Sequence, residues 1–206
     1  SQPVSEANIK DATPASNGQP GNFWLQCSLE HKAPCLLDPY TDHKAKDTQL
    51  ITSLTTPLMA GRSLVGVAGL DLPMKPIQEL LEHMNKSMYE GAGDVLLVSQ
   101  HGYVAGSTRK NIKPGVLLAK AEAEALTKVL ATDKRDVSWQ GEHLQITVPL
   151  HLQGSQSPWG LIVRMPTAVV MAPVIAMQNQ LNGEVTATSW RLLLSALVIG
   201  ALGMGV

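Results

Sequence analysis

The amino-acid sequence predicts an α+β protein made of two modules with antiparallel sheets, followed by a stalk helix and the start of a transmembrane helix. Three observations predict this fold class. Short strand-like runs alternate with glycine turns, the same arrangement occurs twice, and the C-terminal end carries no charge. With 206 residues, the chain is long enough for one large domain or two small ones with proper cores.

A strand hairpin and a helix are expected in the first half of the chain. Residues 1–20 are rich in Ser, Pro, Asn and Gly and are predicted to be a flexible lead-in. Residues 50–59 and 63–72 have the composition of strands, joined by a short turn that contains Gly61. The apolar residues of 77–89 recur with helical spacing, which predicts an amphipathic helix.

A second hairpin, a helix and three more strands are expected in the second half. Residues 94–99 and 103–107 form the predicted hairpin, and residues 117–130, dominated by Ala, Leu, Glu and Lys, form the helix. The further strands are residues 137–139, 144–152 and 159–165.

The pattern of the first hairpin recurs about 92 residues later. In each copy a Pro-Leu pair in one strand is followed by a glycine-hydrophobic pair in the next, and a proline then precedes a helix. That proline is Pro73 in the first copy and Pro166 in the second. The interval matches the size of a small domain, which favours two related modules.

The charge balance and the motif content argue against several classes of function. A net charge of −1 does not suit a nucleic-acid-binding protein, which would carry a basic face. The sequence contains no Gly-x-Ser-x-Gly, His-Glu-x-x-His or phosphate-binding glycine motif. A membrane-anchored enzyme and a purely structural membrane-anchored protein are alternative hypotheses, and we expect no cofactor.

The C-terminal end has the character of a membrane segment. Residues 192–206 (LLLSALVIGALGMGV) contain no charged residue, whereas a bilayer-spanning helix needs about 20 apolar residues. Trp190 and Arg191 precede this run and are typical of the membrane interface. We expect residues 190–206 to begin a transmembrane helix, preceded by a stalk helix at 166–189. A buried C-terminal helix is the alternative.

Cys27 and Cys35 are separated by seven residues. Outside the cytoplasm, a disulfide closing this short loop is expected. Two buried free thiols and a metal site are the alternatives, although the spacing is not typical of zinc ligands and no His pair lies nearby in helical register.

Three segments carry a family resemblance, namely PCLLDPYTD, LITSLTTPLMAGRSLVGVAGLDLPMKPIQELL and YEGAGDVLLVSQHGYVAGST. Over roughly residues 21–165 they resemble the PAS-like double-Cache sensor region of bacterial methyl-accepting chemotaxis receptors. The resemblance implies that residues 21–90 are the end of a membrane-distal, ligand-binding module and residues 91–165 a membrane-proximal one. The family's first transmembrane helix, long N-terminal helix and first distal strands have no counterpart in this sequence.

The resemblance also implies a ligand site. In amino-acid-binding relatives an Arg-x-Trp segment, a Tyr and a later Asp face the ligand, and Trp24, Tyr40 and Asp71 match the last three. Asn22 occupies the Arg position, and Asn cannot clamp a carboxylate as Arg does. With Asp42 as a further candidate, the acidic and aromatic set favours a small cationic amine over an amino acid.

Each site residue also has a structural interpretation. Asp71 could serve the start of the following helix, Tyr40 could be a turn residue, and Trp24 could belong to the core.

The resulting hypothesis is a non-enzymatic sensor of a chemotaxis transducer that signals across the bacterial inner membrane from the periplasm. Its expected partners are a small-molecule ligand, the membrane and a second copy of the chain, without nucleic acid, cofactor or metal. The same sensor could instead serve a histidine kinase or a diguanylate cyclase, since the output domain would follow Val206.

Overall fold

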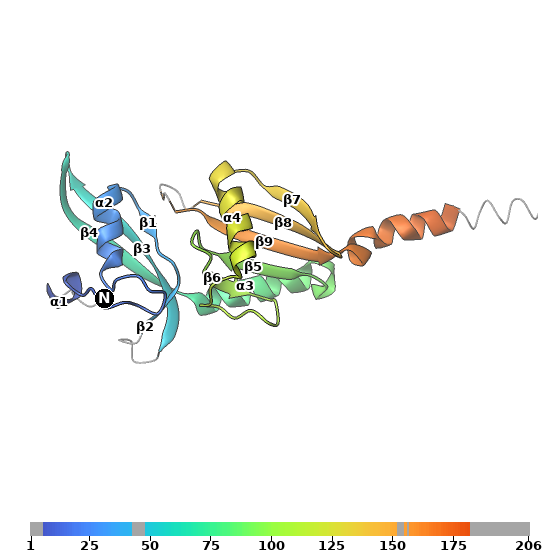
Figure 1. The fold of residues 1–206 in the computed structure, drawn as a ribbon, viewed down its shortest axis with the longest axis horizontal. Coiled ribbons are helices and arrows are strands. Elements are labelled where there is room, and N and C mark those ends of the chain that lie inside the picture. Colours follow the sequence, from blue (N-terminus) through green and yellow to red (C-terminus); the bar gives the residue numbers. More distant parts are fainter. Residues whose placement is uncertain (1–5, 43–47, 152–154, 156, 182–206) are drawn as a thin grey trace, which may run out of the picture. The chain divides into compact units, whose positions relative to one another are not determined.

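The computed structural model describes the chain except residues 1–5, 43–47, 152–154, 156 and 182–206. The described residues contain two antiparallel sheets with helices packed against them, so the predicted α+β class is confirmed (Figure 1). The chain divides into two compact units, Ser1–Pro166 and Thr167–Val206, and both sheets belong to the first unit.

The first sheet is built around one long strand. Strand β3 (Gln49–Ala60) pairs antiparallel with β4 (Ser63–Pro73) and with two short strands, β1 (Cys35–Leu36) and β2 (Tyr40–Asp42). The β3–β4 connection turns at Gly61, whose φ of +63° lies in the region that favours glycine. This is the first hairpin that the sequence predicted.

Helix α2 (Phe23–His31) covers one face of the first sheet, and the short helix α1 (Glu6–Ile9) precedes it. Ser28 of α2 and Thr55 of β3 are both buried, with their hydroxyl oxygens 2.8 Å apart. The helix therefore contacts the sheet through a polar pair as well as through apolar side chains.

The second sheet has five strands in the order β6-β5-β9-β8-β7, all antiparallel to their neighbours. The strands are β5 (Asp94–Val98), β6 (Val104–Ser107), β7 (Asp136–Gln140), β8 (His143–Leu150) and β9 (Trp159–Pro166). Strands were predicted in all five regions, from their short strand-like runs and the turns between them.

Helix α4 (Lys120–Thr132) packs on one face of the second sheet over an aliphatic core. Its Leu126 lies against Gly160, where an added Cβ would clash with a Leu126 methyl group. The core residues are Leu96, Val98, Val104, Leu118, Leu126, Leu130 and Ile162. Gly160 thus allows the helix and β9 to approach closely.

Helix α3 (Met74–Ser87) follows β4 directly but packs against the second sheet. The Gln78 amide nitrogen donates to the Ser107 carbonyl, and the Ser107 N–H donates to Gln78 Oε1, each at 2.8 Å. The short 3-10 helix η1 (Tyr89–Gly91) follows it. The expected boundary between residues 90 and 91 therefore places α3 in the first module, although this helix packs against the second sheet.

A second apolar cluster connects the two sheets. Buried Met74, Ala105 and Trp159 form its centre, and Leu50 and Leu72 of the first sheet pack against them. The two sheets therefore share packed side chains.

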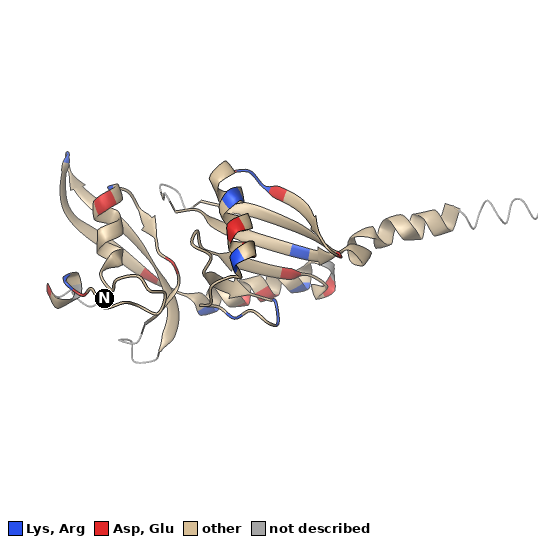
Figure 2. Cartoon of the chain, in the orientation of Figure 1, with Lys and Arg blue, Asp and Glu red and all other residues tan. Residues whose placement is uncertain are grey.

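The face of the second sheet opposite α4 is apolar across β7 and β8. Val137 and Trp139 of β7 are each 56% exposed, and the strand register aligns them with Ile146 and Leu144 of β8. Charged residues gather mostly on the helices and connecting loops, and the strands are mostly uncharged (Figure 2). An apolar sheet face of this kind is unusual at a solvated surface.

In the second unit, residues 167–181 are helical. Within the ranges that the structure describes, no helix is long and apolar enough to cross a membrane. The rest of the expected stalk and the expected transmembrane start at 190–206 lie outside the described residues.

Candidate functional site

Residues 13–21, here called the rim loop, form a tight turn beside the first sheet. The Gly21 N–H donates to the Thr13 carbonyl at 2.8 Å, and the Ala15 N–H donates to the Gln19 carbonyl at 2.7 Å. The side chain of Asn17, only 7% exposed, donates to Gln19 Oε1 at 3.0 Å. Most of the rim loop lies in the segment expected to be a flexible lead-in, yet it is held by specific hydrogen bonds.

A small pocket with a cavity volume of about 30 Å³, partly open to solvent, lies between the rim loop and the first sheet. Trp24 of α2 and Tyr40 of β2 both line it, together with Asn17 and Gln19. The remaining lining residues are Ala15, Pro20, Gly21, Phe23 and Leu37. The pocket therefore presents two aromatic rings and two carboxamides.

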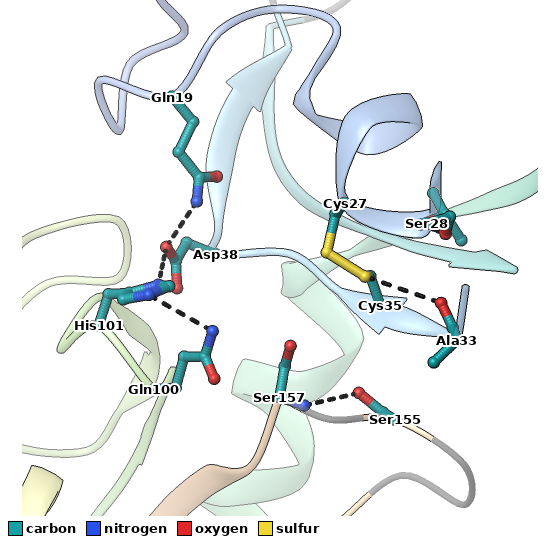
Figure 3. The surroundings of a disulfide bond; sticks show 11 residues. Gln19, Cys27, Ser28, Ala33, Cys35, Asp38, Gln100, His101, Ser155 and Ser157 are labelled. Atoms are coloured by element: carbon teal, nitrogen blue, oxygen red, sulfur yellow. Dashed lines mark hydrogen bonds and ion pairs between the residues drawn. A yellow bond between two sulfur atoms is a disulfide. The ribbon is translucent and has the colours of Figure 1, made fainter. Parts of the chain in front are cut away.

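A disulfide joins Cys27 of α2 to Cys35 of β1 (Figure 3). Both cysteines are buried with Leu37, and Trp24 packs against this cluster. Because Trp24 lies one helical turn before Cys27, the covalent link fixes the position of the ring relative to the sheet.

Tyr40, Ser53 and Asp71 form a hydrogen-bonded chain across the face of the first sheet. The strand register places Ser53 opposite Asp71 and Tyr40 opposite Ile51, two residues from Ser53. The Ser53 hydroxyl donates to Asp71 Oδ1 at 2.6 Å, and Tyr40 Oη lies 2.8 Å from Ser53 Oγ. Since Ser53 has one proton and an ionised carboxylate only accepts, the Tyr40 hydroxyl donates to Ser53.

The predicted site residues thus have different positions. Trp24 and Tyr40 lie in one pocket, while Asp71 is connected to Tyr40 through Ser53 and does not line the pocket. Asp42 ends β2 opposite Gln49, and its side chain lies outside the described part of the chain.

Asn22, at the expected clamp position, is bonded elsewhere: its amide nitrogen donates to the Ile9 carbonyl at 2.9 Å, and its oxygen accepts from Gln26 at 2.9 Å.

Of the three alternative structural roles considered for these residues, the structure supports only that of Trp24. The N-cap position of α3 is Pro73, without a side-chain cap bond, so Asp71 does not cap that helix. Tyr40 lies in a strand and not in a turn. Trp24 does pack against buried side chains, so it serves the core of the first sheet as well as the pocket.

Sequence reasoning missed Asp38 and His101. The Asp38 side chain is 3% exposed, and its Oδ2 accepts from Gln19 Nε2 at 3.0 Å and lies 2.7 Å from His101 Nδ1 (Figure 3). The hydrogen bond and the negative charge of Asp38 raise the pKa of His101 above its ordinary value of 6.5, against the opposing effect of burial. The Asp-Pro-Tyr motif was noted, but no local pattern pairs it with a histidine 63 residues later.

Among the described residues, no group of three or more His, Cys, Asp or Glu side chains could hold a metal ion.

Comparison with known proteins agrees with the expected resemblance. The sequence is 32% identical to methyl-accepting chemotaxis protein TlpQ of Pseudomonas aeruginosa over 208 residues, which cover 98% of this chain and 29% of that protein. The predicted resemblance to a chemoreceptor sensor region is confirmed. The chain spans less than a third of TlpQ. No protein-family model matches the chain.

Two solved structures share the fold of this sensor region. One is the periplasmic sensory domain of the Campylobacter jejuni chemoreceptor Tlp1, with a TM-score of 0.54, 18% identity, and coverage of 72% of this chain and 56% of that one. The other is the extracellular domain of a putative histidine kinase, mmHK1S-Z3, with a TM-score of 0.58, 14% identity, and coverage of 74% and 56%. The sensor region here spans just over half of each.

Proposed function

We propose that this chain is the non-enzymatic sensor region of a membrane-anchored chemotaxis transducer, and that it binds a small cationic amine in the Trp24–Tyr40 pocket. The observation that carries the proposal is that the pocket holds two aromatic rings, one of which, Tyr40, is connected through Ser53 to the Asp71 carboxylate. The Cys27–Cys35 disulfide supports a periplasmic location, because such bonds persist in oxidising compartments.

The chemistry of the pocket suits a cation. The faces of Trp24 and Tyr40 attract an ammonium group. The hydrogen-bonded chain from Tyr40 through Ser53 ends on the Asp71 carboxylate, whose negative charge favours a cation nearby. Ligand pockets usually measure about 300 to 1,000 Å³, whereas this cavity measures about 30 Å³, so as it stands it suits only a small group such as a single ammonium.

Signalling would follow from a difference in ligand affinity between two receptor states. The helix at residues 167–181 follows β9 along the chain and is the element suited to carry the change toward the membrane. We also propose that the transducer is a homodimer anchored by residues 190–206, which crosslinking in membranes would test.

Chemotaxis is the output that the comparisons favour. A fold shared with the extracellular domain of a putative histidine kinase does not discriminate between outputs, whereas 32% identity to a chemotaxis protein over nearly the whole chain does. Sequencing of the region that follows Val206 would decide between a chemotaxis, kinase or cyclase output.

The amine assignment is tested with Asp71→Asn. We expect the affinity for 1,4-diaminobutane or tyramine to fall about tenfold or more, because the charged hydrogen-bond partner of Ser53 is replaced by a neutral one and the negative charge near the pocket is lost. Isothermal calorimetry of the whole chain gives the affinity, with L-leucine and L-arginine as amino-acid ligands for comparison.

The matched control is Asp136→Asn, because Asp136 likewise accepts from a serine, Ser138, at 3.0 Å on β7. That variant should bind the amine as the parent does. Equal amine affinity in the parent and in Asp71→Asn, or binding of amino acids alone, would contradict the assignment.

A further inference from the structure

A polar junction joins the pocket to the second sheet. Asp38 lies between β1 and β2 of the first sheet, and His101 lies in the turn between β5 and β6 of the second. Their 2.7 Å contact places a nearly fully buried carboxylate against the half-exposed imidazole (Figure 3). A buried carboxylate depends strongly on such partners, because its charge is costly to desolvate.

The same junction holds the rim loop in place. Gln19 Nε2 donates to Asp38 Oδ2 at 3.0 Å, and Asn17 Nδ2 donates to the Asp38 carbonyl at 3.2 Å. From the turn before β6 of the second sheet, Tyr103 Oη donates to the Asn17 carbonyl at 2.8 Å. Asn17 and Gln19 also line the pocket, so the residues that face the ligand are those that the junction fixes.

We propose that the Asp38–His101 contact is a pH-sensitive latch, which holds the rim loop over the pocket and couples ligand occupancy to the second sheet. The latch depends on the function proposed above only for the identity of the ligand. Its closed form requires the imidazolium, which donates to Asp38 with a full charge. Loss of the proton leaves a weaker neutral contact, so the rim loop loosens and the pocket loses affinity.

The surroundings of His101 agree with this direction. Among the described residues, Asp38 is the charged group in contact with His101, while Gln100, at 3.4 Å, and Gln19, bonded to the same carboxylate oxygen, are neutral. The Asp38 contact raises the pKa of His101 above 6.5. The stabilisation is therefore complete below pH 6.5 and is lost as the pH rises through the raised pKa.

Hydrogen exchange tests the latch without any ligand. The amide groups of Ala15 and Gln19 report on the rim loop, because both are hydrogen-bonded within it. After correction for intrinsic exchange, their protection in the full chain should fall about three- to tenfold between pH 6.5 and 8.5. In His101→Gln this pH dependence should vanish.

Two further variants separate the latch from general destabilisation. His151→Gln removes a second His–Asp contact, in which the exposed His151 ring lies 2.6 Å from Asp133. Because this contact does not involve the rim loop, the variant should leave the pH dependence of rim-loop exchange unchanged. Tyr103→Phe removes only the hydroxyl that donates to Asn17, so it should lower protection at both pH values and keep the pH dependence.

A binding measurement connects the latch to the ligand. The affinity for 1,4-diaminobutane, which keeps its charge over this range, should fall about three- to tenfold from pH 6.5 to 8.5 in the parent and less than twofold in His101→Gln. Equal pH dependence of rim-loop exchange in the parent and in His101→Gln would overturn the latch. An absence of amine binding at any pH would overturn the proposed ligand class and leave the exchange result to decide on the latch.

Discussion

The central strands of the two sheets bury side chains of different polarity. Strand β3 of the first sheet buries three hydroxyl side chains, Thr52, Ser53 and Thr55, whereas β5 of the second buries Val95, Leu96 and Val98. Buried hydroxyls contribute stability only while each keeps its partner, but buried aliphatic groups contribute wherever they exclude water. The first sheet is therefore suited to rearrange around a ligand, and the second is suited to act as a scaffold.

The largest expected effect lies in the scaffold. Leu126→Ala should cost about 2 to 5 kcal/mol in the free energy of unfolding, because Leu126 of α4 is buried against Gly160 of β9. Urea unfolding followed by circular dichroism measures it. Leu80→Ala, at an exposed position of α3, is the control and should change stability by less than about 0.5 kcal/mol. Similar losses in both variants would mean that the second sheet has no such dry core.

Removal of the disulfide should have the next largest effect, and in the first sheet. Replacing Cys27 and Cys35 together by Ser should cost about 2 to 3 kcal/mol, because the unfolded chain is no longer closed into a short loop. Native-state hydrogen exchange should show the loss in α2 and β1, with β5 and β9 protected as before. Equal loss of protection in both sheets would show that they unfold as a single unit.

The smallest of these effects concerns the pair between Ser28 and Thr55. Ser28→Ala alone should cost about 1 to 2 kcal/mol, because it leaves the buried Thr55 hydroxyl without its partner. The double variant Ser28→Ala/Thr55→Val should cost less than the sum of the two single changes, since no orphaned hydroxyl remains. Thermal unfolding of the four proteins in the cycle gives the coupling energy, and strict additivity would argue against the pair.

Much of the fold could be predicted because its signals are local. The β3–β4 hairpin combines strand composition with a glycine turn, and helix α3 shows apolar residues at helical spacing over its own length. What could not be predicted is which sheet α3 packs against, since this depends on Gln78 meeting Ser107, 29 residues away. The expected membrane segment lies outside the described residues and stays a prediction.

The candidate site was only partly accessible to the same reasoning. Trp24 and Tyr40 were identified through a resemblance to a known family, and the structure places both in one pocket. The rim loop was missed because its contacts are made by single polar groups, such as Asn17 and Gln19, to partners about 20 residues away. Such residues have the composition of a flexible segment and carry no periodic signal.

The apolar face formed by β7 and β8 has a practical consequence for every assay on this protein. Dyes that become fluorescent on apolar surfaces will bind near Trp139 and Val137 in the native state, well before the chain unfolds. A melting curve recorded with such a dye would start from a high signal and hide a small shift caused by a ligand. Trp159, buried where the two sheets meet, offers an intrinsic fluorophore that reports on unfolding without this background.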